Sequence, residues 1–104
     1  MEHVLPEEFD SKIFSTKTLV LIYASWCPYC VSFKLTFEEI NSDGIQKKAV
    51  LVDEDENPLW DRFDIQAVPT MIAFQNGNIL ARRDTKKGIG LTGKNMESMF
   101  KELN

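Results

Sequence analysis

The sequence predicts an α/β fold: a central mixed β-sheet, parallel at its centre and antiparallel at a C-terminal hairpin, flanked by helices on both faces. Three observations lead to this prediction. Continuous apolar runs at 18–24 and 48–53 are typical of strands that are buried on both faces of a parallel sheet. A helical pattern between these runs supplies the crossover that neighbouring parallel strands need. The dipeptide Asn76-Gly77 between two further apolar runs indicates an antiparallel hairpin.

The chain has 104 residues, 43% of them hydrophobic, so we expect a single domain over residues 1–104. At most a short strand is expected at 3–5. A helix should follow, because Pro6 suits a first helical position and Glu7 and Glu8 suit the positive end of a helix. The residues that would share the buried face of this helix are Phe9, Ile13 and Phe14.

The crossover helix is expected over about 28–40, and Ser42-Asp43-Gly44 should end it. Its buried stripe would comprise Phe33, Phe37 and Ile40. Asn57-Pro58 is typical of a helix cap followed by a first helical residue, and predicts another short helix. The apolar residues that this short helix would carry are Leu59, Trp60 and Phe63, and we interpret Trp60 as a packing residue.

The hairpin strands are expected at 70–74 and 78–83. The stretch 85–93 contains three glycines and shows no periodicity. A closing helix is expected over 92–103. Its inward residues would be Met96, Met99, Phe100 and Leu103.

Charge and hydropathy argue against several classes of partner. The net charge is −4, and Asp84 interrupts the one basic cluster, 82–87, so we expect no nucleic-acid partner. The longest apolar run, 19–24, is far shorter than the roughly 20 residues of a membrane helix, so no membrane partner is expected. Met1-Glu2-His3 lacks the basic start of an export signal, which favours a reducing cytoplasm. We expect a monomer.

Both cysteines lie in Trp26-Cys27-Pro28-Tyr29-Cys30, where a predicted strand gives way to a predicted helix. If Pro28 is the first helical residue, Cys27 is the cap, and its sulfur can accept hydrogen bonds from the free N–H groups of the first turn. The positive end of the helix favours the thiolate, which is the nucleophile in disulfide exchange. We therefore expect Cys27 to attack a disulfide, and Cys30 to resolve the mixed disulfide that results.

Two other interpretations of the cysteine pair stay open. The thiols could simply pack near the start of a helix, or they could supply half of a zinc site. A structural zinc site needs four ligands, and beyond the two cysteines the chain offers only His3 and carboxylates. The sequence therefore implies no metal and no organic cofactor.

Three motifs together resemble those of the thioredoxin family, and the likeness runs from about His3 to Leu103. They are Tyr23-Ala24-Ser25-Trp26-Cys27-Pro28-Tyr29-Cys30, Val68-Pro69-Thr70 and Phe74-Gln75-Asn76-Gly77. The resemblance implies a thioredoxin fold and disulfide oxidoreductase activity, with Cys27 as nucleophile and Cys30 as resolving thiol. It also implies that Pro69 is a cis-proline, although the residues alone would make it an ordinary turn residue.

The resemblance further implies how substrates bind. Protein substrates would lie as extended strands across an apolar surface, held by the backbone of Val68 beside Pro69. Trp26 resembles the family's flat wall next to the reactive sulfur, and Pro28 and Tyr29 would complete the surface. The implied partners are disulfide-containing proteins and a reductase such as thioredoxin reductase or glutathione.

The chain departs from the family at two places. Leu21 stands six residues before the first cysteine, where the family usually has a buried aspartate that helps to deprotonate the resolving thiol. Leu51 aligns with the lysine partner of that aspartate, so apolar packing replaces an ion pair and a proton acceptor is lost. We expect slower turnover near neutral pH. The second departure is the dipeptide Pro28-Tyr29, which resembles glutaredoxin and predicts a less reducing potential than that of ordinary thioredoxin.

Two alternative functions stay open. One is a glutaredoxin-like, glutathione-dependent reductase, although Ala67-Val68-Pro69 and Gly88-Ile89-Gly90 differ from the Thr-Val-Pro and Gly-Gly pairs typical of that family. The other is a non-catalytic binding module with a thioredoxin fold. The presence of both cysteines at this spacing favours the redox function over this module.

Overall fold

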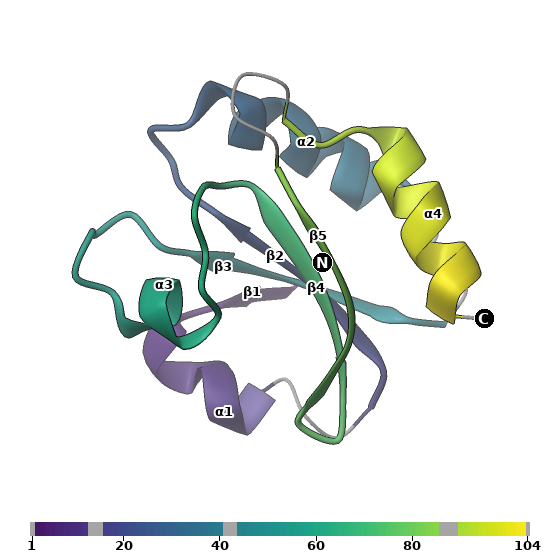
Figure 1. The fold of residues 1–104 in the computed structure, drawn as a ribbon, viewed down its shortest axis with the longest axis horizontal. Coiled ribbons are helices and arrows are strands. Elements are labelled where there is room, and N and C mark those ends of the chain that lie inside the picture. The colour runs from purple at the N-terminus through teal and green to yellow at the C-terminus, as the bar shows by residue number, and fades with distance from the viewer. Residues whose placement is uncertain (1, 13–15, 41–43, 86–89, 104) are drawn as a thin grey trace.

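The computed structural model describes residues 2–12, 16–40, 44–85 and 90–103, and Figure 1 shows their fold. Five strands form one sheet in the order β1-β3-β2-β4-β5. β3 runs parallel to β1 and β2, whereas β4 runs antiparallel to β2 and β5. The predicted mixed sheet is therefore confirmed. The strands are β1 (Glu2–Val4), β2 (Thr18–Tyr23), β3 (Gln46–Leu51), β4 (Thr70–Gln75) and β5 (Asn78–Asp84).

The helices cover both faces of the sheet, as predicted (Figure 1). The 3-10 turn η1 (Pro6–Glu8), α1 (Phe9–Lys12) and α3 (Pro58–Arg62) lie on one face. α2 (Pro28–Glu39) and α4 (Gly93–Leu103) lie on the other. In the described part of the chain, none of these helices has the length and apolar character that a membrane span requires.

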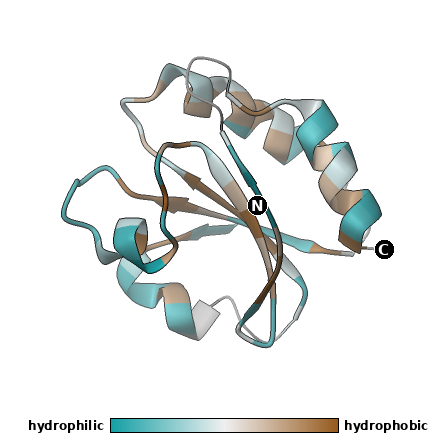
Figure 2. Cartoon of the chain, viewed as in Figure 1, coloured by the Kyte–Doolittle hydropathy of each residue, from teal (hydrophilic) through white to brown (hydrophobic). Residues whose placement is uncertain are grey.

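The central strand β2 contributes side chains to both faces of the core. Val20 and Ile22 pack with the α1 and α3 side, whereas Leu19 and Leu21 pack with the α2 and α4 side, and all four are fully buried. Figure 2 shows hydrophobic residues along the central strands. This two-sided burial is the physical reason for the continuous apolar run in the sequence.

Three phenylalanines form the centre of the core between the sheet and α1 and α3. The ring of Phe9 lies 5.3 Å from that of Phe63 and 5.6 Å from that of Phe74, and the rings of Phe63 and Phe74 are also 5.6 Å apart. The rings meet in tilted or edge-on orientations, which aromatic pairs prefer. Ile13 and Phe14, which we expected beside Phe9, lie outside the described residues.

β3 begins and ends two residues earlier than the predicted 48–53, because Gln46 and Lys47 belong to it. Lys48 is buried and forms an ion pair with Glu2, with Nζ 3.3 Å from Oε1. Lys47 donates from Nζ to carbonyl oxygens at the C-terminal end of α2, those of Phe37, Glu38 and Ile40, at 2.7, 2.9 and 2.6 Å. Long lysine stems can lie along apolar surface while their charged ends find partners.

The other predicted elements differ from the observed ones by one or two residues, and several are capped as expected. Asn57 caps α3, because its Oδ1 accepts a hydrogen bond from Leu59 N at 3.0 Å. Asn76 and Gly77 both have positive φ, 52° and 79°, as a tight two-residue hairpin turn requires. The predicted N-terminal helix is divided into η1 and the single turn α1. Ser42 and Asp43, expected to end α2, lie outside the described residues.

Candidate active site

Cys27 caps the N-terminus of α2, as the sequence predicts. Its backbone is extended, with φ −104° and ψ 111°, and Pro28 is the first helical residue. The sulfur Sγ of Cys27 accepts a hydrogen bond from Cys30 N at 3.2 Å. A thiolate at this position would keep that hydrogen bond and would lie at the positive end of the helix. The local structure therefore suits an attacking sulfur.

The two thiols are free, and they differ in exposure. Both are buried, Cys30 completely and Cys27 with 5% of its surface exposed. Burial, and after it the hydrogen bond with Cys27, raises the pKa of Cys30 to about 12, although a backbone hydrogen bond at Ala24 opposes the shift. Cys30 is therefore a protonated thiol at neutral pH. This asymmetry matches the roles that we expect for an attacking and a resolving cysteine.

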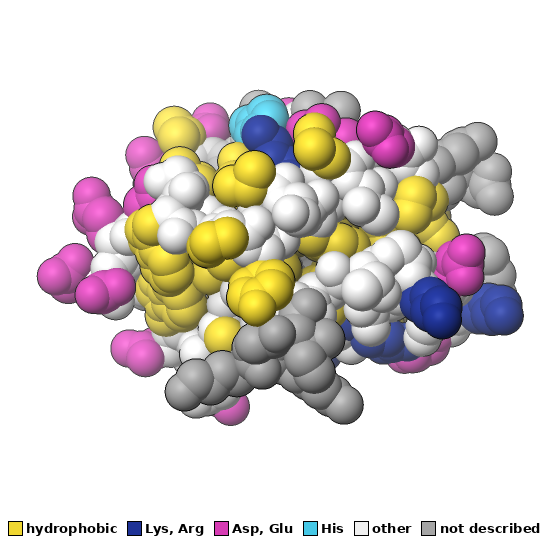
Figure 3. Space-filling model, turned by 90° about the horizontal axis from the view of Figure 1, so that it is seen from above, with side chains coloured by type: hydrophobic (Ala, Val, Ile, Leu, Met, Phe, Trp, Pro, Cys, Tyr) yellow, Lys and Arg dark blue, Asp and Glu magenta, His cyan; other side chains and the backbone are white. Residues whose placement is uncertain are grey.

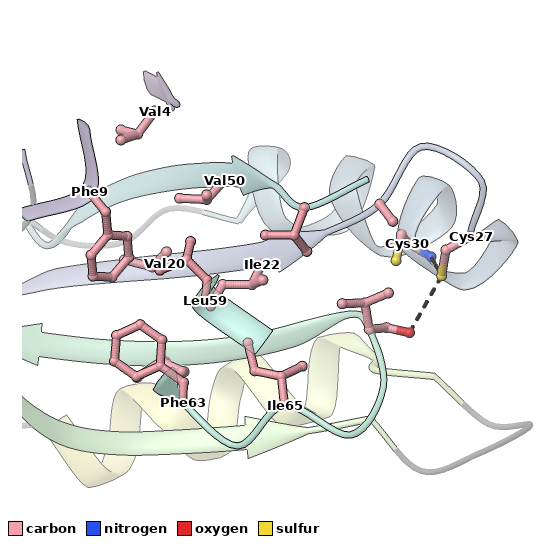
Figure 4. Packing of buried hydrophobic residues seen from close by; sticks show 14 of the residues in the cluster. Val4, Phe9, Val20, Ile22, Cys27, Cys30, Val50, Leu59, Phe63 and Ile65 are labelled. Carbon is pink, nitrogen blue, oxygen red and sulfur yellow. Dashed lines mark hydrogen bonds between the residues drawn. The ribbon is translucent and has the colours of Figure 1, made fainter. Parts of the chain in front are cut away.

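Val68 and Pro69 lie next to the cysteine pair, as the resemblance implied. The Val68-Pro69 peptide bond is cis. The Cys27 thiol donates a hydrogen bond to the carbonyl oxygen of Val68 at 3.5 Å (Figure 4). Val68 as a whole residue is 7% exposed, so it is largely buried beside the sulfur.

Exposed aromatic side chains lie on both sides of Cys27 in the sequence. Trp26 is 57% exposed and Tyr29 is 47% exposed, although large hydrophobic side chains usually bury most of their surface. Figure 3 views the molecule from above, from the side on which α2 lies in Figure 1, and shows hydrophobic side chains gathered on this face with acidic ones at its left edge. Such an apolar surface next to a reactive sulfur can bind a substrate chain.

Ser25 and Asp53 belong to this site, and the sequence analysis did not identify them. Ser25 N donates to Asp53 Oδ1 and Ser25 Oγ donates to Asp53 Oδ2, both at 2.6 Å. These hydrogen bonds lower the pKa of Asp53 below its usual value, so the carboxylate is ionised at neutral pH. The positions of both residues just after predicted parallel strands could have identified the pair, because the carboxyl ends of neighbouring parallel strands meet at the same edge of a sheet. Ser25 follows β2, and Asp53 follows β3.

Leu21 and Leu51, at the two positions where the chain departs from the family, differ in environment. Leu21 is fully buried among Phe33 and Phe37, so an apolar side chain does fill the place of the expected aspartate. Leu51 is 38% exposed and lines a cleft of about 510 Å³ that Tyr23 also lines. Of the two leucines that replace the family's ion pair, only Leu21 is therefore buried.

Among the described residues, no group of three or more His, Cys, Asp or Glu side chains is arranged to hold a metal ion. His3 lines the same cleft as Leu51. Neither cysteine lines that cleft. The geometry gives no support to the interpretation of the cysteines as part of a zinc site.

Gly90 packs against Tyr29, and Gly90→Ala is expected to destabilise the protein by about 2 kcal/mol. Gly90 has a φ of +78°, and an added Cβ would lie 2.9 Å from Tyr29 Cδ1. The matched control is Gly44→Ala, because Gly44 has a similar φ of +88° and, apart from its chain neighbours, none of the described residues has an atom within 4 Å of an added Cβ. The control should cost about 1 kcal/mol, for backbone strain alone. Urea unfolding measures both, and equal losses would contradict the contact with Tyr29.

The comparisons with known proteins agree with this geometry. A family model described as thioredoxin matches residues 1–101. Thioredoxin of Staphylococcus epidermidis is 37% identical over 76 residues, which cover 71% of this chain and 73% of that protein. Thioredoxin of Staphylococcus aureus is 36% identical over the same length and coverage. The crystal structure of Chlamydomonas reinhardtii thioredoxin f2 superposes with a TM-score of 0.82 and covers 100% of this chain and 96% of its own; at 14% identity it supports the fold alone.

Proposed function

The chain belongs to the thioredoxin family, and from this premise we propose that it reduces protein disulfides by cycling Cys27 and Cys30 between dithiol and disulfide. Members of this family are thiol-disulfide oxidoreductases. One observation carries the proposal: the Cys27 sulfur accepts the Cys30 N–H at the start of α2, while the Cys30 thiol is buried and protonated behind it. We propose that residues 1–104 act as one domain.

The proposed reaction has two exchange steps. The Cys27 thiolate attacks one sulfur of the substrate disulfide, so a mixed disulfide forms while the substrate S–S bond breaks, and the leaving thiolate takes up a proton. Cys30 then loses its proton and attacks the Cys27 sulfur, which releases the second substrate thiol. The substrate has gained two electrons and two protons, and the Cys27–Cys30 disulfide has formed. An external dithiol or reductase restores the reduced pair.

The proposed substrate-binding surface surrounds the Cys27 sulfur. It comprises the side chains of Trp26, Pro28 and Tyr29 together with Val68 and Pro69. The exposure of the two aromatic residues and the place of the Val68 carbonyl beside the sulfur support this assignment. Backbone hydrogen bonds to an extended substrate do not depend on its sequence, so the protein should accept many substrates.

The electron donor and the cellular place of the reaction are also proposals. We propose thioredoxin reductase as the donor, because the relatives that share 36–37% identity are named thioredoxin. Glutathione is the alternative donor, because the dipeptide Pro28-Tyr29 between the cysteines resembles that of glutaredoxins, which are glutathione-dependent. A reducing cytoplasm would keep both thiols free between cycles. We also propose that the chain acts there as a monomer in electron transport.

Reduction of insulin disulfides with two alternative donor systems tests the proposed function. We expect fast reduction with NADPH and thioredoxin reductase, and much slower reduction with glutathione and glutathione reductase. The double variant Cys27→Ser/Cys30→Ser is the background control. Faster reduction with glutathione would support the glutaredoxin-like alternative. A rate equal to background with both donors, and with dithiothreitol, would support the non-catalytic binding module.

A further inference from the structure

Asp53 contacts both residues that precede Cys27. Its carboxylate binds Ser25 through two hydrogen bonds of 2.6 Å, one from the backbone N–H and one from the hydroxyl. Its backbone carbonyl oxygen accepts a hydrogen bond from Trp26 Nε1 at 3.1 Å. A single residue at the end of β3 therefore holds the backbone of one neighbour of Cys27 and the side chain of another.

The segment that Asp53 holds has little other backbone support. Beyond the end of β2, the residues before α2 form a turn whose own hydrogen bond, from Cys27 N to Ala24 O, is 3.4 Å long and therefore weak. The sheet supports the start of this turn, because Val52 N donates to Tyr23 O at 2.8 Å. The contacts of Asp53 extend that support to the residue adjacent to the sulfur.

We propose that Asp53 is a positioning residue for disulfide exchange: it fixes Ser25 and Trp26 so that Cys27 presents its sulfur to the substrate from one direction. The inference rests on the proposed function. Attack on a disulfide requires the three sulfur atoms to lie nearly in line, and Cys27 is only 5% exposed, so a substrate can approach it from few directions. Movement of Trp26 would change both the approach and the wall against which the substrate packs.

The negative charge of Asp53 has a separate effect that the test must distinguish. Among the causes that raise the pKa of Cys30, this charge is the last, after burial and the contacts with Cys27. Asp53→Asn removes the charge, yet the amide can still accept from Ser25 N and donate to Ser25 Oγ. Asp53→Ala removes the charge and both side-chain hydrogen bonds to Ser25, and keeps the backbone carbonyl that accepts from Trp26 Nε1. The comparison of these two variants therefore isolates positioning.

The test compares the rate constant for insulin reduction with the rotational freedom of Trp26. We expect Asp53→Ala to lower the second-order rate constant about tenfold and Asp53→Asn to lower it by no more than about twofold. The matched control is Glu56→Ala, which removes the same charge from an exposed residue of the same loop and should have no effect. In a Trp60→Phe background, the fluorescence anisotropy of Trp26 should fall in Asp53→Ala, because loss of the anchor to Ser25 lets the segment before Cys27 move away from the Asp53 carbonyl that accepts from Trp26 Nε1. It should stay unchanged in Asp53→Asn.

The results separate the possible explanations. An equal loss of rate in Asp53→Asn and Asp53→Ala would overturn the proposal in favour of a charge effect, and an unchanged rate in Asp53→Ala would exclude any role. Should Asp53→Ala not fold, Ser25→Ala removes only the hydroxyl hydrogen bond; a rate about threefold lower supports the proposal, and an unchanged rate overturns it. If the wild type does not reduce insulin, the proposed function is wrong, whereas the anisotropy still reports whether Asp53 holds Trp26.

Discussion

Cys27→Ser is expected to lower the rate of protein-disulfide reduction by more than about a thousandfold. A serine hydroxyl does not ionise at neutral pH, and it cannot form a disulfide with the substrate. Cys30 cannot replace the lost nucleophile, because its side chain is fully buried and its pKa is raised by that burial. Substitution of Cys27 should therefore prevent the mixed disulfide from forming, whereas substitution of Cys30 should prevent it from being resolved.

Cys30→Ser is the matched variant, because it retains the proposed attacking sulfur and removes only the proposed resolving one. We expect it to accumulate a mixed disulfide between Cys27 and insulin, which mass spectrometry detects as an adduct lost on treatment with dithiothreitol. Cys27→Ser should form no adduct under the same conditions. An adduct at Cys30 in Cys27→Ser, formed as fast as the one at Cys27, would reverse the assigned roles.

The local signals in the sequence predicted the elements around the site well, because each depends on near neighbours. Pro28 suits the first helical position, where no backbone N–H is needed, and this makes Cys27, the residue before it, the cap of α2. The turn at Asn76 and Gly77 follows from their tolerance of positive φ. The run 18–24 is apolar throughout because both of its faces are buried.

Contacts between segments far apart in the sequence could not be predicted in the same way. The hydrogen bonds between Asp53 and Ser25 join residues whose strands become neighbours only in the folded sheet. Lys47 lay outside the predicted strand, and it enters β3 because carbonyl oxygens at the end of α2 accept hydrogen bonds from its ammonium group. The cis form of the bond before Pro69 followed from the resemblance, since local sequence favours trans.

The departure at Leu21 has a consequence for the second half of the reaction. In the family, a buried aspartate is thought to help take the proton from the resolving thiol, and here that position holds a fully buried leucine. Cys30 is also fully buried, in the other hydrophobic cluster, which contains Ile22 and Val68. Burial thus disfavours the Cys30 thiolate, while no carboxylate at position 21 can accept the proton. Resolution of the mixed disulfide is therefore the step that we expect to depend most strongly on pH.

The rate of this resolving step is expected to rise about tenfold per pH unit, or about a thousandfold from pH 6.5 to 9.5, with no plateau. Only the thiolate attacks, and the thiolate fraction of Cys30 grows with pH as long as the pH lies below the raised pKa of the thiol. In the mixed disulfide, Cys27 no longer donates or accepts as a thiol, which removes one cause of the raised pKa. Burial, the largest cause, remains.

Stopped-flow reaction with less than one equivalent of 5,5′-dithiobis(2-nitrobenzoate) measures both steps in one experiment. The first release of nitrothiobenzoate reports the attack by Cys27, and the second reports the resolution by Cys30. Cys30→Ser should show the first phase alone, which assigns the second phase. A second phase that levels off near neutral pH would contradict the prediction. It would mean that another group takes the proton from Cys30 in spite of its burial and of the leucine at position 21.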